Sequence, residues 1–498
     1  MNVNPITRLD YPDPDVIRVE DTYYMVSTTM HFMPGCEILQ SFDLVHWEHV
    51  TYVYETLDHT DAQQLKSGQN IYGQGMWAAS LRYHEGRFYI CFVANDTRKT
   101  YLYTSEKIDG PWKKQLIEGF YHDGSLLFDE DGRNYIVYGN DEIWITELNE
   151  DLTAPKKDGL HRLLVSDHKN PELGYEGSHI QKINGYYYIF LVHSLRDRWM
   201  RTEACFYSDS LEGEFTGGDV LCDDRGYCGQ GVAQGGIVDT PDGKWYAMLF
   251  QDSGAVGRIP ILLPVTWKDH FPVFGQNGHV PEEIEVHSTR PGYIYQPLVG
   301  SDDFCNGLLP RWQFNHDPDP RYYHLDALQG TYTITTREVC TELTQAVNTL
   351  TQRMSYPSCA AEVTVDASAL KEGDVAGLCA LQSCYAAVGI TKHHGKYEVL
   401  MLDKKEDGIL DMTERTVVES HQMDFRLEAD FCNMKDEARC YYRVNKGDWL
   451  PIGTVHKLYF KLDHFTGCRF GLFCYAAEET GGSACFRDFK YYDVDEIS

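Results

Sequence analysis

The sequence predicts an all-β protein in which a five-bladed β-propeller is followed by a β-sandwich domain. Two patterns carry this prediction. Hairpin-like segments recur at intervals through the first half of the 498 residues, and short alternating strands fill the last part of the chain. A third observation agrees with them, since no long stretch has the 3.6-residue periodicity of an amphipathic helix.

Five segments of the first half share one design: a short strand, a turn rich in Gly, Asp or Glu, and a second strand that opens on aromatic residues. This is the signature of a β-hairpin. The segments are residues 13–24, 77–89, 123–135, 176–188 and 234–246. Because they recur at intervals of 46 to 64 residues, they predict a radial array of small sheets with one such hairpin in each blade.

The residues that lead these segments point to a functional site. They are Asp13, Trp77, Asp123, Glu176 and Gln234. Equivalent positions of the blades surround one axis in a propeller, so three carboxyl groups are expected in one cup. Any single acid could simply accept backbone N–H groups at a strand end, but three acids in phase with the repeat favour chemistry.

The remaining elements complete two domains. Residues 1–300 are expected to form the propeller, closed by a strand at 258–267 that returns to the first blade and so removes a free sheet edge. From about residue 270 the segment is turn-rich and charged, as in a surface linker. Residues 301–498 are expected to form a two-sheet sandwich of the concanavalin or jelly-roll kind that caps the cup. Its strands are predicted at 330–336, 360–366, 385–390, 469–475 and 486–492.

Composition excludes several classes of partner. The formal net charge is −31, from 44 basic and 75 acidic residues, so neither nucleic acid nor an anionic membrane is expected as a partner. No apolar run approaches the ~18 residues of a membrane span. The 15 cysteines are scattered without a CxxC pair, which favours a reducing compartment over a disulfide framework. Together with an N-terminus that lacks a signal-peptide pattern, this predicts a cytoplasmic protein.

Several motifs of the propeller half, taken in order, resemble family 43 of the glycoside hydrolases. They are Tyr11-Pro-Asp-Pro-Asp-Val, His122-Asp-Gly-Ser-Leu-Leu-Phe-Asp and Tyr175-Glu-Gly-Ser-His-Ile. The later half resembles the sandwich of xylosidase-like members, through Asp303-Phe and Arg311-Trp-Gln-Phe-Asn-His. Each motif alone is weak, whereas all of them in order, in phase with the repeat, are strong.

The resemblance implies a role for each acid. Asp13 maps to the general base, Glu176 to the general acid, and Asp123 to a second Asp that tunes the pKa of the acid and orients it. Gly124 stands where the family usually has Pro, a mild departure. A general acid must stay protonated near neutrality, which burial or a like charge nearby favours.

Four further residues are expected to bind the sugar by the same resemblance: Phe32, Trp77, Arg258 and Gln234. Packing between blades is the alternative for Phe32 and Trp77, and a core ion pair is the alternative for Arg258. Many members carry His where this chain has Gln234, near a central calcium or water site. Gln is a poorer metal ligand, so no metal site and no required cofactor is expected. Calcium in the sandwich lacks the support of an Asp-rich loop with ligand spacing.

The resemblance implies an exo-acting, inverting hydrolase that releases a terminal pentose from xylan- or arabinoxylan-type oligosaccharides. It would act as a β-D-xylosidase, an α-L-arabinofuranosidase or both. Inverting enzymes hold their two carboxyl groups roughly 6.5–9.5 Å apart, leaving room for a water, and blades 1 and 4 of five are not neighbours. The alternatives are a retaining fructan or sucrose hydrolase and a sugar-binding propeller without catalysis. We further expect a small oligosaccharide as the substrate and a homo-oligomeric assembly.

Overall fold

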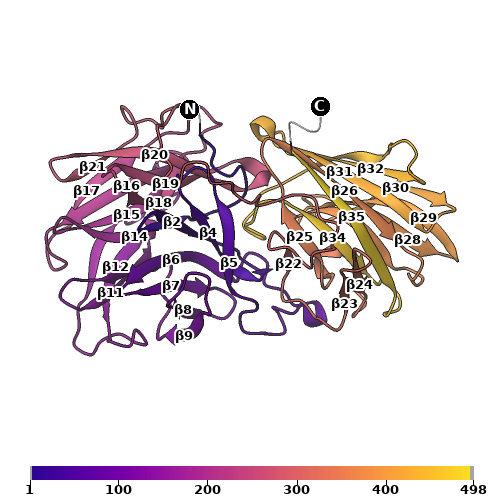
Figure 1. Cartoon of the computed structure of the whole chain (residues 1–498), viewed down its shortest axis with the longest axis horizontal. Coiled ribbons are helices and arrows are strands. Elements are labelled where there is room, and N and C mark those ends of the chain that lie inside the picture. Colours follow the sequence, from indigo (N-terminus) through magenta and orange to yellow (C-terminus); the bar gives the residue numbers. More distant parts are fainter. Residues whose placement is uncertain (1–2, 494–498) are drawn as a thin grey trace.

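The structure, a computed structural model that describes residues 3–493, consists almost entirely of strands. Five four-stranded sheets form the first part of the chain and two larger sheets form the second. Figure 1 shows the two parts side by side, the propeller from indigo to magenta and the sandwich from orange to yellow. The predicted fold class is confirmed. Among the described residues no helix is long and apolar enough to cross a membrane.

Each blade is an antiparallel sheet whose strands follow one another along the chain, and each predicted hairpin supplies its first two strands. Blade 1 contains β1 (Asp15–Val19), β2 (Thr22–Ser27), β4 (Gly35–Ser41) and β5 (Glu48–Tyr54). Blade 2 contains β6 (Met76–His84), β7 (Arg87–Ala94), β8 (Lys99–Ser105) and β9 (Lys113–Ile117). Blade 3 contains β10 (Ser125–Phe128), β11 (Asn134–Asn140), β12 (Glu142–Leu148) and β13 (His161–Ser166). Blade 4 contains β14 (Glu176–Ile183), β15 (Tyr186–Ser194), β16 (Arg201–Ser208) and β17 (Thr216–Leu221). Blade 5 contains β18 (Val232–Asp239), β19 (Trp245–Asp252), β20 (Arg258–Lys268) and β21 (Phe271–Phe274).

The blades are held together by the apolar side chains that alternate along their strands. Between blades 4 and 5, for example, Phe190 packs with Ile237 and Leu249, all fully or almost fully buried. The innermost strands β1, β6, β10, β14 and β18 contact one another around the axis. Burial of one such side chain is worth about 1.5–3 kcal/mol, and the aromatic residues that open each second strand contribute to these cores.

Ring closure differs from the prediction. The strand predicted at 258–267 is β20, which pairs with β19 and β21 inside blade 5 and not with a strand of blade 1. The N-terminal segment closes the ring instead, because Ile6 donates its N–H to Pro260 O and Tyr11 donates to Arg258 O. Asn4 adds two bonds to the backbone of Leu262. The linker expected from about residue 270 opens with β21, so the stretch without strands begins after Phe274.

The sandwich consists of an eight-stranded and a seven-stranded sheet. The first contains β22 (Gln313–Asn315), β25 (Leu350–Arg353), β27 (Val375–Leu381), β28 (Ala386–His393), β29 (Lys396–Lys404), β30 (Leu410–Val418) and β34 (Arg469–Tyr475), with β3 (Phe32–Met33) from the propeller half at its edge. The second contains β23 (Tyr323–Asp326), β24 (Thr331–Thr335), β26 (Ser358–Asp366), β31 (Gln422–Asp430), β32 (Glu437–Val444), β33 (Leu450–Lys457) and β35 (Ser483–Asp493). Short 3-10 turns occur at η1 (Lys66–Gly68), η2 (Gly254–Val256), η3 (Leu343–Gln345) and η4 (Cys432–Met434).

The two domains share a sheet and a buried ion pair. Strand β3 lies between β2 and β4 in the chain but pairs with β22 of the sandwich, Phe314 facing Met33. Arg353 of the sandwich donates from Nη1 to Glu37 Oε2 of blade 1 over 2.8 Å, with both side chains buried. Continuous hydrogen bonding across the boundary holds the sandwich against one side of the propeller.

Candidate active site

Hydrogen bonds between neighbouring blades fix which residues are equivalent around the ring. Leu81 N–H donates to Asp15 Oδ2 (2.7 Å), and Leu126 N–H donates to Ser80 Oγ (3.1 Å). The same bond joins Ile180 N–H to Ser125 Oγ (3.0 Å). The acceptor residues Asp15, Ser80 and Ser125 therefore occupy equivalent places around the ring, and the residue two places before each of them is called the repeated position.

In two blades the residue at the repeated position is not the lead residue that the sequence predicted. Asp13 and Asp123 are equivalent, but Ala78 and Gly177 are their counterparts in blades 2 and 4, so Trp77 and Glu176 lie one residue earlier than predicted. A β-bulge, which places an extra residue in one strand, lies at the repeated position in blades 2 and 4, and also in blade 5 between Ala233 and Gly236, where Gln234 is in phase. The register shifts between Met76 and Ala79, and again between Glu176 and His179.

The repeated position has an unusual backbone. Asp13, Asp123 and Gln234 have φ values of 53°, 47° and 64°, and Gly177 has 67°. Left-handed φ values are uncommon outside glycine and cost of order 1–3 kcal/mol when the surrounding structure enforces them. Such strain gathers at functional sites, and here it recurs at one end of the axis in four blades.

Asp13 is held from two sides. The residue is 6% exposed, and its carboxylate accepts from Thr28 Oγ1 at 2.5 Å. Arg258 Nη1 donates to Asp13 Oδ1 at 3.1 Å, and both side chains are buried. The predicted arginine therefore contacts the predicted base directly. Its ion pair is not a separate core feature but part of the site.

Glu176, Asp123 and His122 form a second group. His122 Nε2 lies 3.5 Å from Asp123 Oδ2 and 3.6 Å from Glu176 Oε2. Asn140 Nδ2 donates to Glu176 Oε2 at 2.9 Å, and Gly177 N–H donates to Asp123 Oδ2 at 3.0 Å. The bond from Gly177 couples the position of Asp123 to the backbone that carries Glu176.

The charged side chains in this group shift one another's pKa values. The Asp123 carboxylate raises the pKa of His122 to about 9, and Glu176 adds to the effect against the opposing cost of burial. Burial raises the pKa of Asp123 to about 6, with His122 opposing and the negative charges of Glu176 and Asp13 contributing. At neutral pH the group therefore holds a protonated His122 beside an ionised Asp123.

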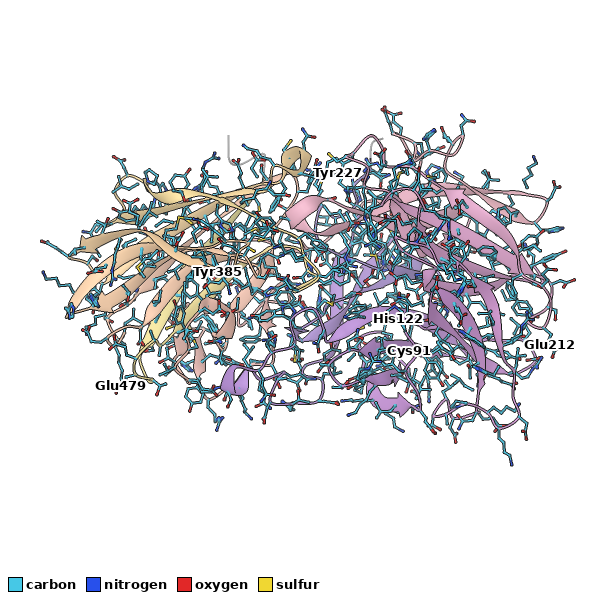
Figure 2. All side chains as sticks on the ribbon, turned by 180° about the vertical axis from the view of Figure 1, so that it is seen from behind. Cys91, His122, Glu212, Tyr227, Tyr385 and Glu479 are labelled. Carbon is cyan, nitrogen blue, oxygen red and sulfur yellow. The ribbon has the colours of Figure 1, made fainter. Side chains whose placement is uncertain are left out.

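His122 was not predicted as a site residue, although the motif that supplied Asp123 contains it. Figure 2 shows it in the propeller half of the molecule. It occupies the position in blade 3 that Glu176 occupies in blade 4, one residue before the repeated position. A comparison of these preceding residues, and not only of the lead residues, would have indicated it.

The sandwich reaches the site through Phe465. The centroid of its ring lies 5.7 Å from that of Trp77, and the guanidinium carbon of Arg258 lies 4.2 Å from its centre. The carboxylate of Asp10 accepts from the N–H of Arg258 (2.8 Å) and of Gly467 (2.7 Å). Trp77 was predicted to form a wall of the site, and it lies against Phe465 of the second domain in such a wall.

Phe32 packs between the two domains, and its contact with the sugar stays a prediction. Its side chain is 2% exposed and packs in a core cluster with residues of the sandwich, among them Tyr385 and Phe473. The guanidinium carbon of Arg469 lies 3.4 Å from its ring centre. These contacts arise because β3 joins the sandwich sheet, pairing with β22.

Gln234 lies beside the predicted acid. A Cβ added to Gly177 would stand 2.7 Å from Gln234 Cγ, so the glutamine side chain packs directly against Gly177. Gln234 donates its N–H to Glu203 Oε2 over 2.7 Å, and burial raises the pKa of Glu203 well above its usual value. Gln234 thus supports the strand that carries Glu176.

Arg201, the first residue of β16, is a buried cation that the sequence analysis missed. Its Nε donates to Asp252 Oδ2 at 2.9 Å. Burial lowers the pKa of Arg201, but Asp252 beside it raises the pKa above its usual value, with further contributions from Glu176 and Asp13. Arg201 is therefore close enough to both acids to share their field.

One set of side chains in the described residues could coordinate a metal ion. His122, Asp123 and Glu176 offer ligand atoms that all lie within 4.8 Å of one another. These are the same atoms that hold the protonated His122 next to two acids. A cation there would compete with that proton, so the donor set serves proton chemistry as readily as metal binding.

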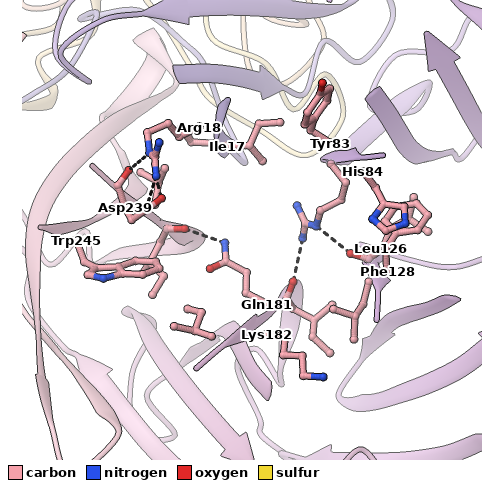
Figure 3. A pocket seen from close by; sticks show the side chains of 17 residues that line it. Ile17, Arg18, Tyr83, His84, Leu126, Phe128, Gln181, Lys182, Asp239 and Trp245 are labelled. Atoms are coloured by element: carbon pink, nitrogen blue, oxygen red, sulfur yellow. Dashed lines mark hydrogen bonds and ion pairs between the residues drawn. The ribbon is translucent and has the colours of Figure 1, made fainter. Parts of the chain in front are cut away.

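A second concavity lies at the other end of the inner strands, with a volume of about 400 Å³. Figure 3 shows its polar side chains bonded to one another: Arg18 pairs with Asp239, and Gln181 donates to Ile237 O. Arg82 bonds Asp15 and Ser125. Because these polar side chains already bind one another or the backbone, none of them is free to act on a substrate in this concavity.

The fold and the site together define a class. A five-bladed propeller carries a buried Asp on blade 1 and a Glu–Asp–His group on blades 3 and 4 at the same end of its axis. Hydrolysis of a glycosidic bond requires such a pair of carboxyl groups, one to protonate the leaving oxygen and one to act on the nucleophile. The arrangement is that of a glycoside hydrolase.

Comparisons with known proteins agree in both domains. Residues 3–272 match the family model described as glycosyl hydrolases family 43, and residues 301–492 match the beta xylosidase C-terminal concanavalin A-like domain. The chain belongs to glycoside hydrolase family 43.

Three individual relatives are between 24% and 42% identical to this chain. A beta-xylosidase of Formosa agariphila is 27% identical over 99% of this chain and 89% of its own length. A non-reducing end alpha-L-arabinofuranosidase of Bacteroides ovatus is 24% identical over 82% of this chain and 79% of its own. The solved structure of a bifunctional GH43-CE protein of Bacteroides eggerthii is 42% identical with a TM-score of 0.92. It covers 99% of this chain, which spans 63% of that longer protein.

Proposed function

We propose that the protein is an exo-acting, inverting glycosidase that releases a terminal pentose from xylan- or arabinoxylan-type oligosaccharides. It would act as a β-D-xylosidase, an α-L-arabinofuranosidase or both. The single observation that carries the proposal is the pairing of Asp13 with Arg258 on one side of the cup and of Glu176 with Asp123 and His122 on the other. Relatives named for xylosidase and arabinofuranosidase activities support the substrate class.

In the proposed reaction Asp13 takes a proton from water while the water oxygen bonds to the anomeric carbon. Glu176 gives its proton to the glycosidic oxygen as the bond to that oxygen breaks. Attack from the face opposite the leaving group inverts the anomeric centre. Asp123 maintains a negative charge beside Glu176, and Asn140 fixes the orientation of the acid through its 2.9 Å hydrogen bond.

The domain arrangement supports exo attack. Phe465 and the loop that carries it stand against Trp77 and Arg258, so the sandwich closes one side of the cup. A closed side favours a chain end over an internal unit of a polymer. We also propose that hydrolysis needs no cofactor, because side chains of this chain supply both the acid and the base.

The first test is kinetic. Asp13→Ala and Glu176→Ala are each expected to lower kcat on xylobiose or an arabinose-substituted xylo-oligosaccharide by about 10²–10⁴-fold, the usual contribution of a general acid or base. Asp239→Asn is the matched control, since Asp239 pairs with Arg18 at the other end of the axis. Undiminished hydrolysis by Glu176→Ala would contradict the assignment.

The second test is stereochemical. Proton NMR during the first minutes of hydrolysis should show the anomer opposite to that of the substrate. Release of the retained anomer would indicate the retaining alternative, and binding of the oligosaccharide without turnover would indicate a sugar-binding propeller. Initial rates on the two nitrophenyl pentosides rank xylose against arabinose.

A further inference from the structure

Trp199 is a large aromatic side chain left 44% exposed on the turn between β15 and β16. Scattered exposed apolar residues are ordinary on a protein surface. Trp199 differs because of its neighbour: the guanidinium carbon of Arg201 lies 5.3 Å from the indole ring and 5.2 Å from the ring of Phe250. The indole of Trp199 thus packs against Arg201, a buried cation of the active site.

Arg201 places Trp199 relative to the chemistry. Its Nε is bound to Asp252, and within residues 3–493 no hydrogen bond is made by its two Nη atoms. Arg258, which binds Asp13, also lies over the Phe250 ring, at 5.4 Å. Arg258 of blade 5 and then Arg201 and Trp199 of blade 4 therefore follow Asp13 of blade 1 along one wall, and Trp199 is the most exposed of the four.

The turn that carries Trp199 is fixed before any ligand arrives. Met200 donates its N–H to Ser194 Oγ over 2.8 Å. Arg196 donates to Asp167 Oδ1 and to Lys169 O, each over 2.8 Å. A side chain on a pinned turn loses little further freedom on binding, which is the advantage of preorganisation.

We propose that Trp199 and Arg201 form the subsite for the leaving-group sugar, the unit next to the terminal pentose. The inference rests on the proposed function. Phe465 and Arg258 line the side on which Asp13 lies, while the leaving oxygen must meet Glu176. Glu176 pairs with Val192 and Arg201 pairs with Ser194, so the turn that carries Trp199 lies at the end of blade 4 where Glu176 stands. The indole face would stack on the apolar face of a pyranose ring, and the Nη groups of Arg201 would donate to its hydroxyls.

The experiment compares two substrates that differ only in the leaving group. Trp199→Ala should lower kcat/KM on the disaccharide roughly tenfold, the scale of one aromatic stacking contact. Hydrolysis of the corresponding pentosyl fluoride, whose leaving group has no sugar ring, should stay within about twofold of wild type. Trp199→Phe should retain most of the activity on the disaccharide.

The control variant is Trp144→Ala on the outer part of blade 3, where the indole stacks on His161; it should leave both substrates unchanged. Equal losses on the disaccharide and the fluoride would show that Trp199 is only structural, and an unchanged disaccharide rate would also overturn the subsite. If the wild-type protein cleaves neither substrate, the proposed function fails and the subsite with it. If the wild-type protein cleaves both and Trp199→Ala equals it, only the subsite fails.

Discussion

His122 links the two acids of blades 3 and 4, and its charge sets the state of Asp123. The imidazolium opposes the burial that raises the pKa of Asp123. Without that positive charge the carboxyl would remain protonated to higher pH, and a neutral Asp123 no longer holds a negative charge beside Glu176. The ionised form is present above a pKa of about 6, so its contribution to catalysis is lost as the pH falls through that value.

His122→Asn should therefore shift the acidic limb of the kcat/KM profile upward by ~1 pH unit, the typical effect of one nearby charge. Activity at neutral pH should fall as a consequence. A pH–rate profile from pH 4 to 9 measures both effects. His84→Asn, which removes an imidazole stacked on Phe128 at the far end of the axis, should leave the profile in place. An unshifted limb in His122→Asn would refute the coupling.

Single residues show what could be predicted at this scale. Asp13, Asp123 and Arg258 were found because each stands in a local motif, and the structure brings Asp13 and Arg258 into direct contact. The packing of Phe32 against the sandwich could not be predicted, because no local pattern reveals that its strand pairs with β22, some 280 residues away. Arg201 opens the third strand of its blade, outside the hairpin on which the prediction was based.

Among the elements, the inner strands owe their function to bulges. The bulge in β14 lies at Gly177, the counterpart of Asp13 and Asp123, and Glu176 is the residue before it. The alternation of apolar residues after the bulge is undisturbed, since Val16, Leu126 and Ile180 are all buried at one level. The hairpins were predictable from this alternation, whereas an extra residue at a strand start leaves no trace in it.

Gly177 is the residue that this arrangement requires. Its φ is 67°, and a Cβ would stand 2.7 Å from Gln234 Cγ. Gln234 cannot easily retreat because Glu203 binds its backbone. Gly177→Ala should therefore destabilise the protein by about 1–3 kcal/mol and lower kcat/KM at least tenfold, because the neighbouring Glu176 shifts.

Urea unfolding and initial rates measure the two effects. Gly185→Ala is the matched control, because Gly185 has a φ of 84° in the β14–β15 turn but no atom within 4 Å of an added Cβ. It should lose about 1–2 kcal/mol from backbone strain while retaining full activity. Equal activity of the two variants would show that the contact with Gln234 is unimportant.

At the scale of the whole molecule, the interface between the domains both stabilises the arrangement of the two domains and positions a residue of the active site. The shared β3–β22 pairing and the Arg353–Glu37 ion pair lock the sandwich to blade 1. The loop that carries Phe465 into the cup ends at this same interface, where Arg469 of β34 pairs with Arg353 of β25. Two domains could be predicted from the change in strand pattern, but the contacts between them could not, because they join residues hundreds of positions apart.

A cluster of histidine rings anchors that loop. His464, next to Phe465, stacks on Tyr72 with ring centroids 3.9 Å apart. His31 lies 4.9 Å from His316 and 5.9 Å from His464, centroid to centroid. Burial lowers the pKa of His464 to about 3 and the pKa values of His31 and His316 well below their usual range. All three are neutral in the folded protein.

Stability should therefore decline in acid. Each buried histidine has a folded pKa below its unfolded value of about 6.5, so the unfolded chain binds more protons and stability is lost as the pH falls below that value. For His464 at pH 5 the loss is about 2 kcal/mol. His464→Phe keeps a ring on Tyr72 but cannot be protonated, so its unfolding free energy should fall by about 2 kcal/mol less than that of wild type between pH 7.5 and pH 5. Urea unfolding at the two pH values measures the difference. His161→Phe, an exposed ring stacked on Trp144, should follow the wild-type pH dependence, and a His464→Phe variant that does the same would show that the cluster does not set the acid limit of the fold.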